Sequence, residues 1–293
     1  MKLYYFDFRK RFRGGSNFGD DLNVWLWDRL APGLLDDDDR VAFVGIGTLL
    51  DTQKLPPENA QHTVIFGSGA GYGETPTIDD SWTIYCVRGP RTAKALGISK
   101  DLVLTDGGIL ARRAFDFQNV PKTREFAYMP HVWRSYYGGV GWEAVCRRLG
   151  FGYIDARWPV ERVFREIATT KTLLTEAMHG AIIGDAFRVP WIPARSHSSI
   201  PPFKWHDWCE SVGVEYQPHD IVELVDPKPE TGTIARLRYE VKKSIAAAQL
   251  YRLAYTTQPT LSDEGKTKEL EERMAQKLEQ LRSDAAAGKF RLD

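Results

Sequence analysis

Trp82-Thr-Ile-Tyr-Cys-Val-Arg-Gly-Pro-Arg-Thr-Ala-Lys-Ala-Leu-Gly97 carries the clearest indication of the fold class. Trp82–Val87 is an apolar run of strand length, and Pro90–Leu96 has helical spacing with proline in its first turn. Gly97 is typical of the residue that follows a helix. The stretch therefore predicts a strand, a tight turn and a helix, which is the repeating unit of a parallel α/β sheet.

The same pattern recurs along the rest of the chain. Further strands are expected at Leu3–Phe8, Val41–Ile46, Thr63–Phe66, Phe126–Met129, Tyr153–Asp155, Thr172–Thr175 and Pro190–Pro193. Further helices are expected at Leu22–Leu30 (capped by Asp20 or Asp21), Trp142–Leu149, Val160–Ala168, Ala177–Ala186, Trp205–Val212 and Ile234–Ala254. Alternating strands and helices predict an α/β fold with helices on both faces of parallel sheets.

The length of 293 residues suits two domains, although a single large sheet remains an alternative. We place an N-terminal α/β domain at 1–120, a second at 121–230 with a hinge near Asn119–Lys122, and C-terminal helices at 231–293. In the last segment, Leu270, Met274 and Leu278 lie at helical spacing. This amphipathic helix is expected to pack on the body or on a partner subunit, with membrane-surface contact as the alternative.

Composition excludes several classes of protein. Lys+Arg and Asp+Glu both number 39, and this balance argues against bulk binding of nucleic acid. The three cysteines are far apart and lack metal-ligand spacing, so we expect neither disulfides nor a metal site, and a cytoplasmic protein. The short apolar run before the basic cluster Arg9–Arg13 is too short for a signal peptide, and no stretch is long enough to span a membrane.

Polar residues and glycines follow several of the expected strands, where ligands bind in open α/β sheets. Asn17, Asp20 and Asp21 lie between the first strand and helix, where they can hold sugar hydroxyls or cap the helix. Gly67-Ser-Gly69-Ala-Gly71 lacks the spacing of a dinucleotide fingerprint, but it lets a backbone approach a ligand, unless it forms only a tight turn.

Cationic and imidazole side chains stand at the same ends of the strands. Arg88 and Arg91 flank a helix start, where an arginine opposes the helix dipole unless a bound anion or a neighbouring acid compensates. His179 lies in the first turn of a late helix and is a candidate general acid or base. His131 also ends a strand, and Arg195 and Lys204 are further candidate anion ligands or solvated surface charges.

In this order, the motifs resemble the polysaccharide pyruvyl transferase family, and in particular its bacterial exopolysaccharide branch. The resemblance spans about residues 1–215. It rests on Asn17-Phe-Gly-Asp20, the turns Gly45–Gly47 and Gly67–Gly71, Val-Arg88-Gly-Pro, Thr-Asp106-Gly-Gly, His179, Val-Pro190 and the loop that contains Lys204.

The resemblance implies two Rossmann-like domains in a glycosyltransferase-B-like arrangement. It also implies transfer of a carboxyethylidene group from phosphoenolpyruvate, a co-substrate, to two hydroxyls of a sugar, with no further cofactor. His179 is then the catalytic residue. Donor-binding residues would be Arg88, Arg91, Gly69, Lys204 and Arg195, and acceptor-binding residues would be Asn17, Asp20, Asp21 and His131.

The chain departs from the family pattern at Ala177, where many members have an arginine two residues before the histidine. Arg91, Arg195 or Lys204 would then supply the missing cation. Two rival functions stay open, a nucleotide-sugar-dependent glycosyltransferase and a non-catalytic saccharide-binding protein. A lipid-linked acceptor, peripheral contact with the inner face of the membrane and a homo-oligomeric state also stay open.

Overall fold

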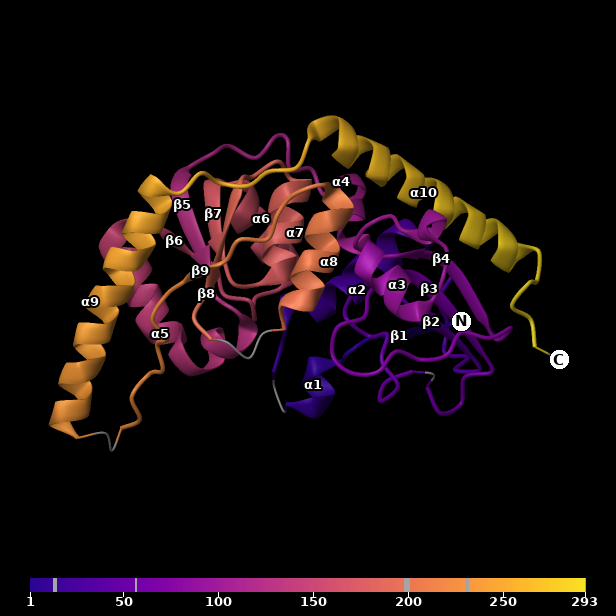
Figure 1. Ribbon diagram of the computed structural model, residues 1–293, viewed down its shortest axis with the longest axis horizontal. Coiled ribbons are helices and arrows are strands. Elements are labelled where there is room, and N and C mark those ends of the chain that lie inside the picture. The colour runs from indigo at the N-terminus through magenta and orange to yellow at the C-terminus, as the bar shows by residue number, and fades with distance from the viewer. Residues whose placement is uncertain (13–14, 56, 198–200, 230–231, 293) are drawn as a thin grey trace.

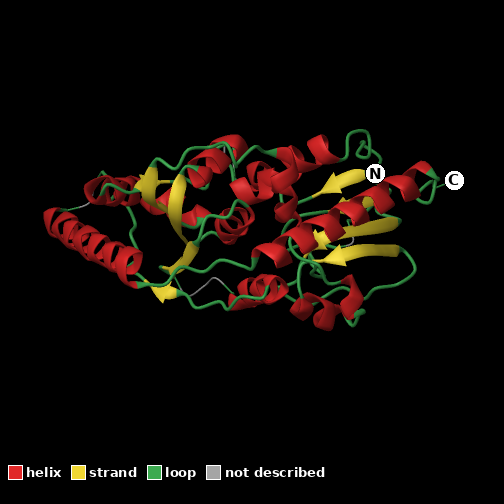
Figure 2. Cartoon of the chain, turned by 90° about the horizontal axis from the view of Figure 1, so that it is seen from above, coloured by secondary structure: helices red, strands yellow, loops and turns green. Residues whose placement is uncertain are grey.

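The computed structural model describes residues 1–12, 15–55, 57–197, 201–229 and 232–292. These residues form two parallel sheets, of four and five strands, and so confirm an α/β fold with helices on both faces. Figure 1 shows both sheets and the helices around them, and Figure 2 shows the strands from above.

The first sheet has the strand order β1-β2-β3-β4, from Lys2–Tyr4, Val41–Val44, His62–Ser68 and Trp82–Val87. Its helices and short helical turns are α1 (Phe8–Arg11), α2 (Phe18–Leu30), α3 (Pro90–Leu96), two 3-10 helices (Lys100–Leu102 and Gly107–Leu110) and α4 (Ala111–Ala114). Strand β4 and helix α3 match the predicted bounds, and Gly97 ends α3 with a φ of 66°.

The second sheet has the strand order β6-β5-β7-β8-β9, from Gly152–Tyr153, Arg124–Met129, Thr170–Thr175, Trp191–Arg195 and His219–Asp220. Its helices are α5 (Val132–Leu149), α6 (Val160–Ala168), α7 (Met178–Ala186), α8 (Pro202–Val212) and α9 (Thr233–Thr256). The last helix, α10 (Glu264–Ala286), returns to the first sheet (Figure 1).

Three predicted details are wrong. The first strand ends at Tyr4 instead of Phe8, because the Phe8 ring begins α1 and stacks on Tyr136 at 5.7 Å. Asn17, and neither Asp20 nor Asp21, caps helix α2. Helix α5 begins at Val132, ten residues before the predicted Trp142.

The apolar core joins the two sheets. One buried cluster contains side chains from α2 and α10 beside the first sheet and from α6, α7 and α8 beside the second. Leu270, Met274, Leu278 and Leu281 of α10 belong to this cluster. The predicted packing of the C-terminal helix on the body is therefore confirmed, and its apolar face is not available to a membrane.

Candidate active site

The imidazole of His179 lies at the start of α7 and faces the carboxylate of Asp106. Its Nε2 is 3.8 Å from Oδ1 of Asp106, which also accepts a hydrogen bond from the Gly108 N–H at 2.9 Å. Within the described residues, Nε2 of His179 and Oδ2 of Asp106 are buried without a hydrogen-bond partner. Buried polar atoms are nearly always paired, so two unpaired atoms on neighbouring side chains indicate a place for a ligand hydroxyl or a water.

Burial and nearby charges keep the His179 imidazole neutral at neutral pH, whereas the Asp106 carboxylate stays mostly ionised. Burial lowers the pKa of His179 to about 3, and the nearby Lys204 and Arg88 cations lower it further. Burial raises the pKa of Asp106 to about 6. The imidazole is therefore neutral and can accept a proton.

Helix α2 brings Asn17 and Asp20 to the same site. Asn17 donates a hydrogen bond from Nδ2 to Oδ2 of Asp20 at 2.6 Å, and its own Oδ1 caps the helix at Gly19 N–H. Burial raises the pKa of Asp20 to about 7, although the bond from Asn17 and the charge of Lys204 oppose this rise. Asp20 is therefore partly protonated at neutral pH.

Gly19 is required for this close packing. A Cβ at Gly19 would lie 2.3 Å from Nδ1 of His179. Asp21 points elsewhere, because its carboxylate accepts from Ser16 Oγ at 2.6 Å and pairs with Arg9 at 3.0 Å. The structure thus packs the start of α2 against His179, places Asp20 near Lys204, as His179 is, and turns Asp21 toward Ser16 and Arg9.

A cationic pocket of about 160 Å³ is lined by Lys204, whose charge also acts on His179. Lys204 donates a hydrogen bond to the Tyr72 hydroxyl at 3.0 Å. Burial lowers the pKa of His131 to about 3, and the charges of Lys204 and Arg134 add to this effect. Among the predicted residues, the structure therefore brings Lys204, His131, His179 and Asp20 together.

Glu176 and Asp106 belong to the site, although the sequence did not single out either as a site residue. The buried Glu176 carboxylate accepts hydrogen bonds from the backbone N–H groups of Ser196 and of His131, the latter at 3.3 Å. It thereby ties the ends of β5, β7 and β8 together around the pocket. Each of these acids directly follows a threonine at the end of a strand or in a turn, and this pattern is only a weak sequence signal for a site residue.

Arg88 is fully buried, and its guanidinium is held inside the protein. Nε donates to Oδ2 of Asp207 at 2.9 Å, Nη1 to Thr48 Oγ1 at 2.9 Å and Nη2 to the Ala70 carbonyl at 2.7 Å. A Cβ on Gly69 would lie 2.2 Å from Cζ of Arg88, so glycine makes room for this side chain. Neither Arg88 nor Gly69 therefore presents a free group to a donor in this arrangement.

Asp207 supplies the anion that the sequence led us to expect at the start of α3. Its Oδ1 accepts from the Thr92 backbone N–H at 2.8 Å, and its Oδ2 accepts from Thr92 Oγ1 at 2.7 Å. Arg91 pairs with Glu210 at 2.6 Å. Helix α8 thus compensates both arginines with its own acids, which was the alternative to a bound ligand.

Arg195 lies outside the cluster around His179. Its guanidinium makes two hydrogen bonds to the Asp220 carboxylate, at 2.7 and 3.1 Å. The role in donor binding predicted for Arg195 stays a prediction, as does that of Arg88, Arg91 and Gly69.

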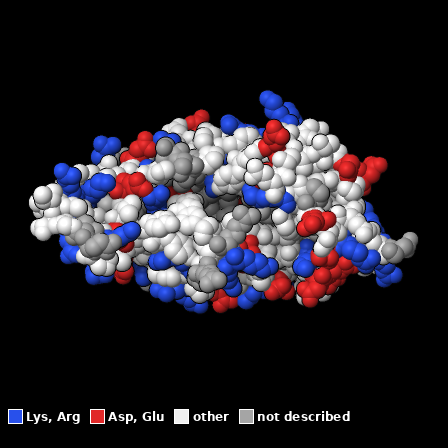
Figure 3. Space-filling model, turned by 90° about the horizontal axis from the view of Figure 1, so that it is seen from below, with Lys and Arg blue, Asp and Glu red and all other residues white. Residues whose placement is uncertain are grey.

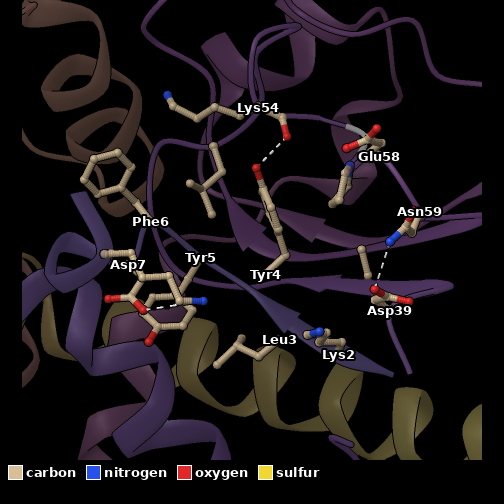
Figure 4. Close-up of a pocket in the computed structure, with 14 residues that line it drawn as sticks. Lys2, Leu3, Tyr4, Tyr5, Phe6, Asp7, Asp39, Lys54, Glu58 and Asn59 are labelled. Atoms are coloured by element: carbon tan, nitrogen blue, oxygen red, sulfur yellow. Dashed lines mark hydrogen bonds and ion pairs between the residues drawn. The ribbon is translucent and has the colours of Figure 1, made fainter. Parts of the chain in front are cut away.

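A larger pocket of about 370 Å³ opens at the free edge of strand β1 (Figure 4). The Tyr4 hydroxyl donates to the Lys54 carbonyl at 2.6 Å on one side of it. Tyr5 and Asp7 line its other end and lie close enough to Asp20 for their charges to interact. Aromatic, amide and charged side chains together suit a polar ring-shaped ligand such as a sugar.

The described ranges contain no group of three or more His, Cys, Asp or Glu side chains placed to hold a metal ion, and the expectation of a metal-free protein stays a prediction. No helix among the described residues is both long and apolar enough to cross a bilayer.

The fold and this site define an α/β protein with two parallel sheets, a buried histidine–carboxylate pair and a cationic pocket whose lysine acts on that histidine. No family model matches the chain. It is 40% identical over 223 residues to the succinoglycan biosynthesis protein ExoV of Rhizobium meliloti (strain 1021), covering 75% of this chain and 68% of that protein. The chain therefore belongs to the same family as this succinoglycan biosynthesis protein.

Proposed function

We propose that the protein transfers a pyruvyl (carboxyethylidene) group from phosphoenolpyruvate to two hydroxyls of a sugar in exopolysaccharide biosynthesis. The sugar belongs to an exopolysaccharide or to its lipid-linked precursor, and the products are a ketal and phosphate. Membership in the family of a succinoglycan biosynthesis protein supports the biosynthetic role. The ordered motifs of the sequence support the pyruvyl donor.

The observation that carries this proposal is the neutral His179, which faces Asp106 and is acted on by the charge of Lys204 in a small cationic pocket. Phosphoenolpyruvate carries a phosphate and a carboxylate on three carbons, so it fits a compact pocket with fixed cations. Lys204 contributes its charge there, and Arg134, which pairs with Glu223, lines the same pocket. The His179 imidazole can take a proton from an incoming hydroxyl.

The proposed reaction has three proton transfers, and solvent returns the proton taken up by His179 to Asp20 after each turnover. Asp20, which is partly protonated at neutral pH, delivers a proton to the methylene carbon of the donor. The first sugar hydroxyl then attacks the carbon that bears the phosphate ester and loses its proton to His179. The C–O bond to phosphate breaks, the second hydroxyl attacks the same carbon, and its proton leaves with phosphate. Lys204 stabilises the charge on the departing phosphate.

The acceptor sugar is proposed to reach this point from the pocket at the edge of β1. Tyr5 and Asp7 lie at one end of that pocket (Figure 4) and interact electrostatically with Asp20, which is hydrogen-bonded to Asn17. Sugars beyond the reacting ring would occupy the pocket, which suits an acceptor of more than one ring.

The two sheets are proposed to be the Rossmann-like domains of a glycosyltransferase-B-like arrangement, at 1–120 and 121–230, with the helices of 231–293 as an extension. Between β4 and β5 the described residues contain no strand, and this supports a division into two domains in that segment. A cytoplasmic location, where phosphoenolpyruvate is available, accords with this function. No cofactor beyond the donor is required by the proposed steps.

Thermal melting with phosphoenolpyruvate tests the donor assignment, because a ligand that binds only the folded protein raises its melting temperature. We expect the wild type to shift with phosphoenolpyruvate and not with a nucleotide sugar. Lys204→Ala should lose the shift. Lys94→Ala removes the same charge from the exposed side of α3 and should retain it.

A shift with a nucleotide sugar alone would replace the proposal by glycosyl transfer. Phosphate release from phosphoenolpyruvate, with a membrane-derived saccharide fraction as acceptor, then tests turnover. Saccharide binding with no phosphate release would indicate a non-catalytic relative.

A further inference from the structure

Helix α9 presents an apolar ridge to solvent. Ile234, Leu237 and Val241 in its first half are 72%, 66% and 54% exposed, and the ridge continues through Ile245 and Tyr255. These residues recur at the spacing that places side chains on one side of a helix. Isolated exposed apolar residues are common, but a ridge of five on one helix indicates an interaction surface.

The opposite side of α9 already packs on the protein. Ala246, Leu250 and Leu253 are buried against the second sheet and helix α5. The first two turns of α9 are exposed almost all round and extend past α5 at one end of the molecule (Figure 1). The side chains of the ridge therefore do not pack into the core of this chain.

The charges beside the ridge are almost all positive. Residues 233–256 include five basic side chains and one acid, whereas the whole chain has a formal net charge of zero. The basic residues are Arg236, Arg238, Lys242, Lys243 and Arg252, and the acid is Glu240. Figure 3 shows Lys and Arg side chains around uncoloured ones at the α9 end of the molecule. A helix with an apolar side and basic flanks is typical of one that lies on an anionic membrane.

A second copy of the same helix fits this surface less well. If two α9 ridges met, the flanks that carry Arg238, Lys242 and Arg252 would be brought together without acids between them, and like charges at close range repel. An anionic lipid surface instead complements both the apolar ridge and its charge.

We propose that α9 docks the protein on an anionic lipid surface, with Ile234, Leu237 and Val241 inserted among the headgroups. The short helix α1 lies at the same lower edge of the molecule as the start of α9 (Figure 1). Lys10 and Phe12 at this position are exposed, so this segment offers a second basic and apolar contact. Two such contacts on one edge orient the protein on the surface. This inference does not depend on the proposed reaction.

Co-sedimentation with lipid vesicles tests the inference on the full chain. We expect the wild type to bind vesicles that mix phosphatidylglycerol with phosphatidylcholine, to lose most of this binding at high salt, and to bind pure phosphatidylcholine weakly. The double variant Leu237→Glu/Val241→Glu should bind the anionic vesicles at least tenfold more weakly. Both positions are exposed, so its melting temperature should stay near that of the wild type.

The matched control is Gln276→Glu/Gln280→Glu, which adds the same two charges to exposed positions of α10 and should bind as the wild type does. Equal binding by the α9 double variant would overturn the proposal, as would the absence of any binding by the wild type. A dimer in sedimentation velocity that the α9 substitutions dissolve would also overturn it, because the occupant would then be a second copy.

Discussion

Nε2 of His179 lies 3.8 Å from Oδ1 of Asp106, and neither this nitrogen nor the second carboxylate oxygen has a hydrogen-bond partner among the described residues. The separation exceeds that of a hydrogen bond, so both atoms remain able to bond to a hydroxyl that approaches from one side of the pair. The pair is therefore arranged to receive a proton from a bound group.

His179→Gln should reduce phosphate release by about 10²–10⁴-fold, the usual contribution of general acid–base catalysis. Its melting temperature should not fall, since the wild-type imidazole is buried without its full set of hydrogen bonds. Enzyme assays beside circular dichroism melts provide the check. Full activity in a folded variant would remove His179 from the reaction.

Gly19→Ala should reduce turnover by about 100-fold, since a displacement of about 1 Å at a catalytic group can cost that much. The new Cβ would lie 2.3 Å from Nδ1 of His179, so the imidazole must move. Gly265 occupies the same position in the first turn of α10, two residues after its cap, and provides a matched control. Gly265→Ala should leave turnover unchanged, and equal effects of the two substitutions would contradict the prediction.

The neutral state of His131 should make stability depend on pH. Its pKa is about 3 in the folded protein and 6.5 in an ordinary environment, so between these values the unfolded chain binds the extra proton. The free energy of unfolding therefore falls on acidification below pH 6.5, by about 1.4 kcal/mol per pH unit for this group. Melting temperatures from pH 7.5 to 4.5 should fall less steeply for His131→Gln than for the wild type.

The pKa of Asp20 is shifted in the opposite direction, so Asp20 should make stability depend on pH in the opposite sense to His131. Its pKa of about 7 lies above the ordinary value of 3.8, so the folded protein holds the extra proton between these values. This contribution to stability is present below pH 3.8 and is lost as the pH rises through 7. Asp20→Asn should therefore gain stability relative to the wild type as the pH rises. The same trend in both variants would contradict the assigned shifts.

Arg88→Ala should destabilise the protein by about 3–5 kcal/mol, because it leaves the buried Asp207 carboxylate without its cation. Arg91→Ala removes a half-exposed pair with Glu210 and should cost less than about 1 kcal/mol. Urea titrations of both variants provide the measurement. A stable Arg88→Ala protein that no longer responds to phosphoenolpyruvate would instead favour a direct role in donor binding.

Met274→Ala should cost about 2–5 kcal/mol, because the side chain is fully buried between α10 and the first sheet. Gln276→Ala, on the exposed side of the same helix, should change stability by less than about 0.5 kcal/mol. Similar melting temperatures for the two variants would show that α10 does not need this contact.

The sequence predicted local elements well where propensity and packing agree. In Trp82–Gly97 the apolar strand, the early proline and the final glycine all indicate one unit, and the structure has it at the predicted bounds. The start of α5 was missed because Gly138, Gly139 and Gly141 weaken the helical pattern. Gly138 is required there by tertiary contact, since a Cβ would lie 2.2 Å from the Leu224 carbonyl oxygen.

The candidate site could be predicted only in part, because tertiary contacts between distant segments also determine where its residues lie. His179 and Lys204 were found because each stands at a strand end or in a loop where ligands bind. The pairing of Arg88 with Asp207, 119 residues away, depends on how α8 packs against α3, and no local pattern encodes it. Asp106 acquires its place beside His179 through the same kind of long-range packing.

Helix α8 has a consequence for how this chain can be recombined. Lys204 faces the pocket, while Asp207 and Glu210, three and six residues later, hold α3 of the first half. Lys204, the cation of the proposed donor pocket, and the contact between the halves are therefore built on one segment. A chimera that joins residues 1–120 of this protein to the second half of a relative would need to take α3 and α8 from the same protein. If the two helices did not match, a buried charge would lose its partner and Lys204 would be displaced.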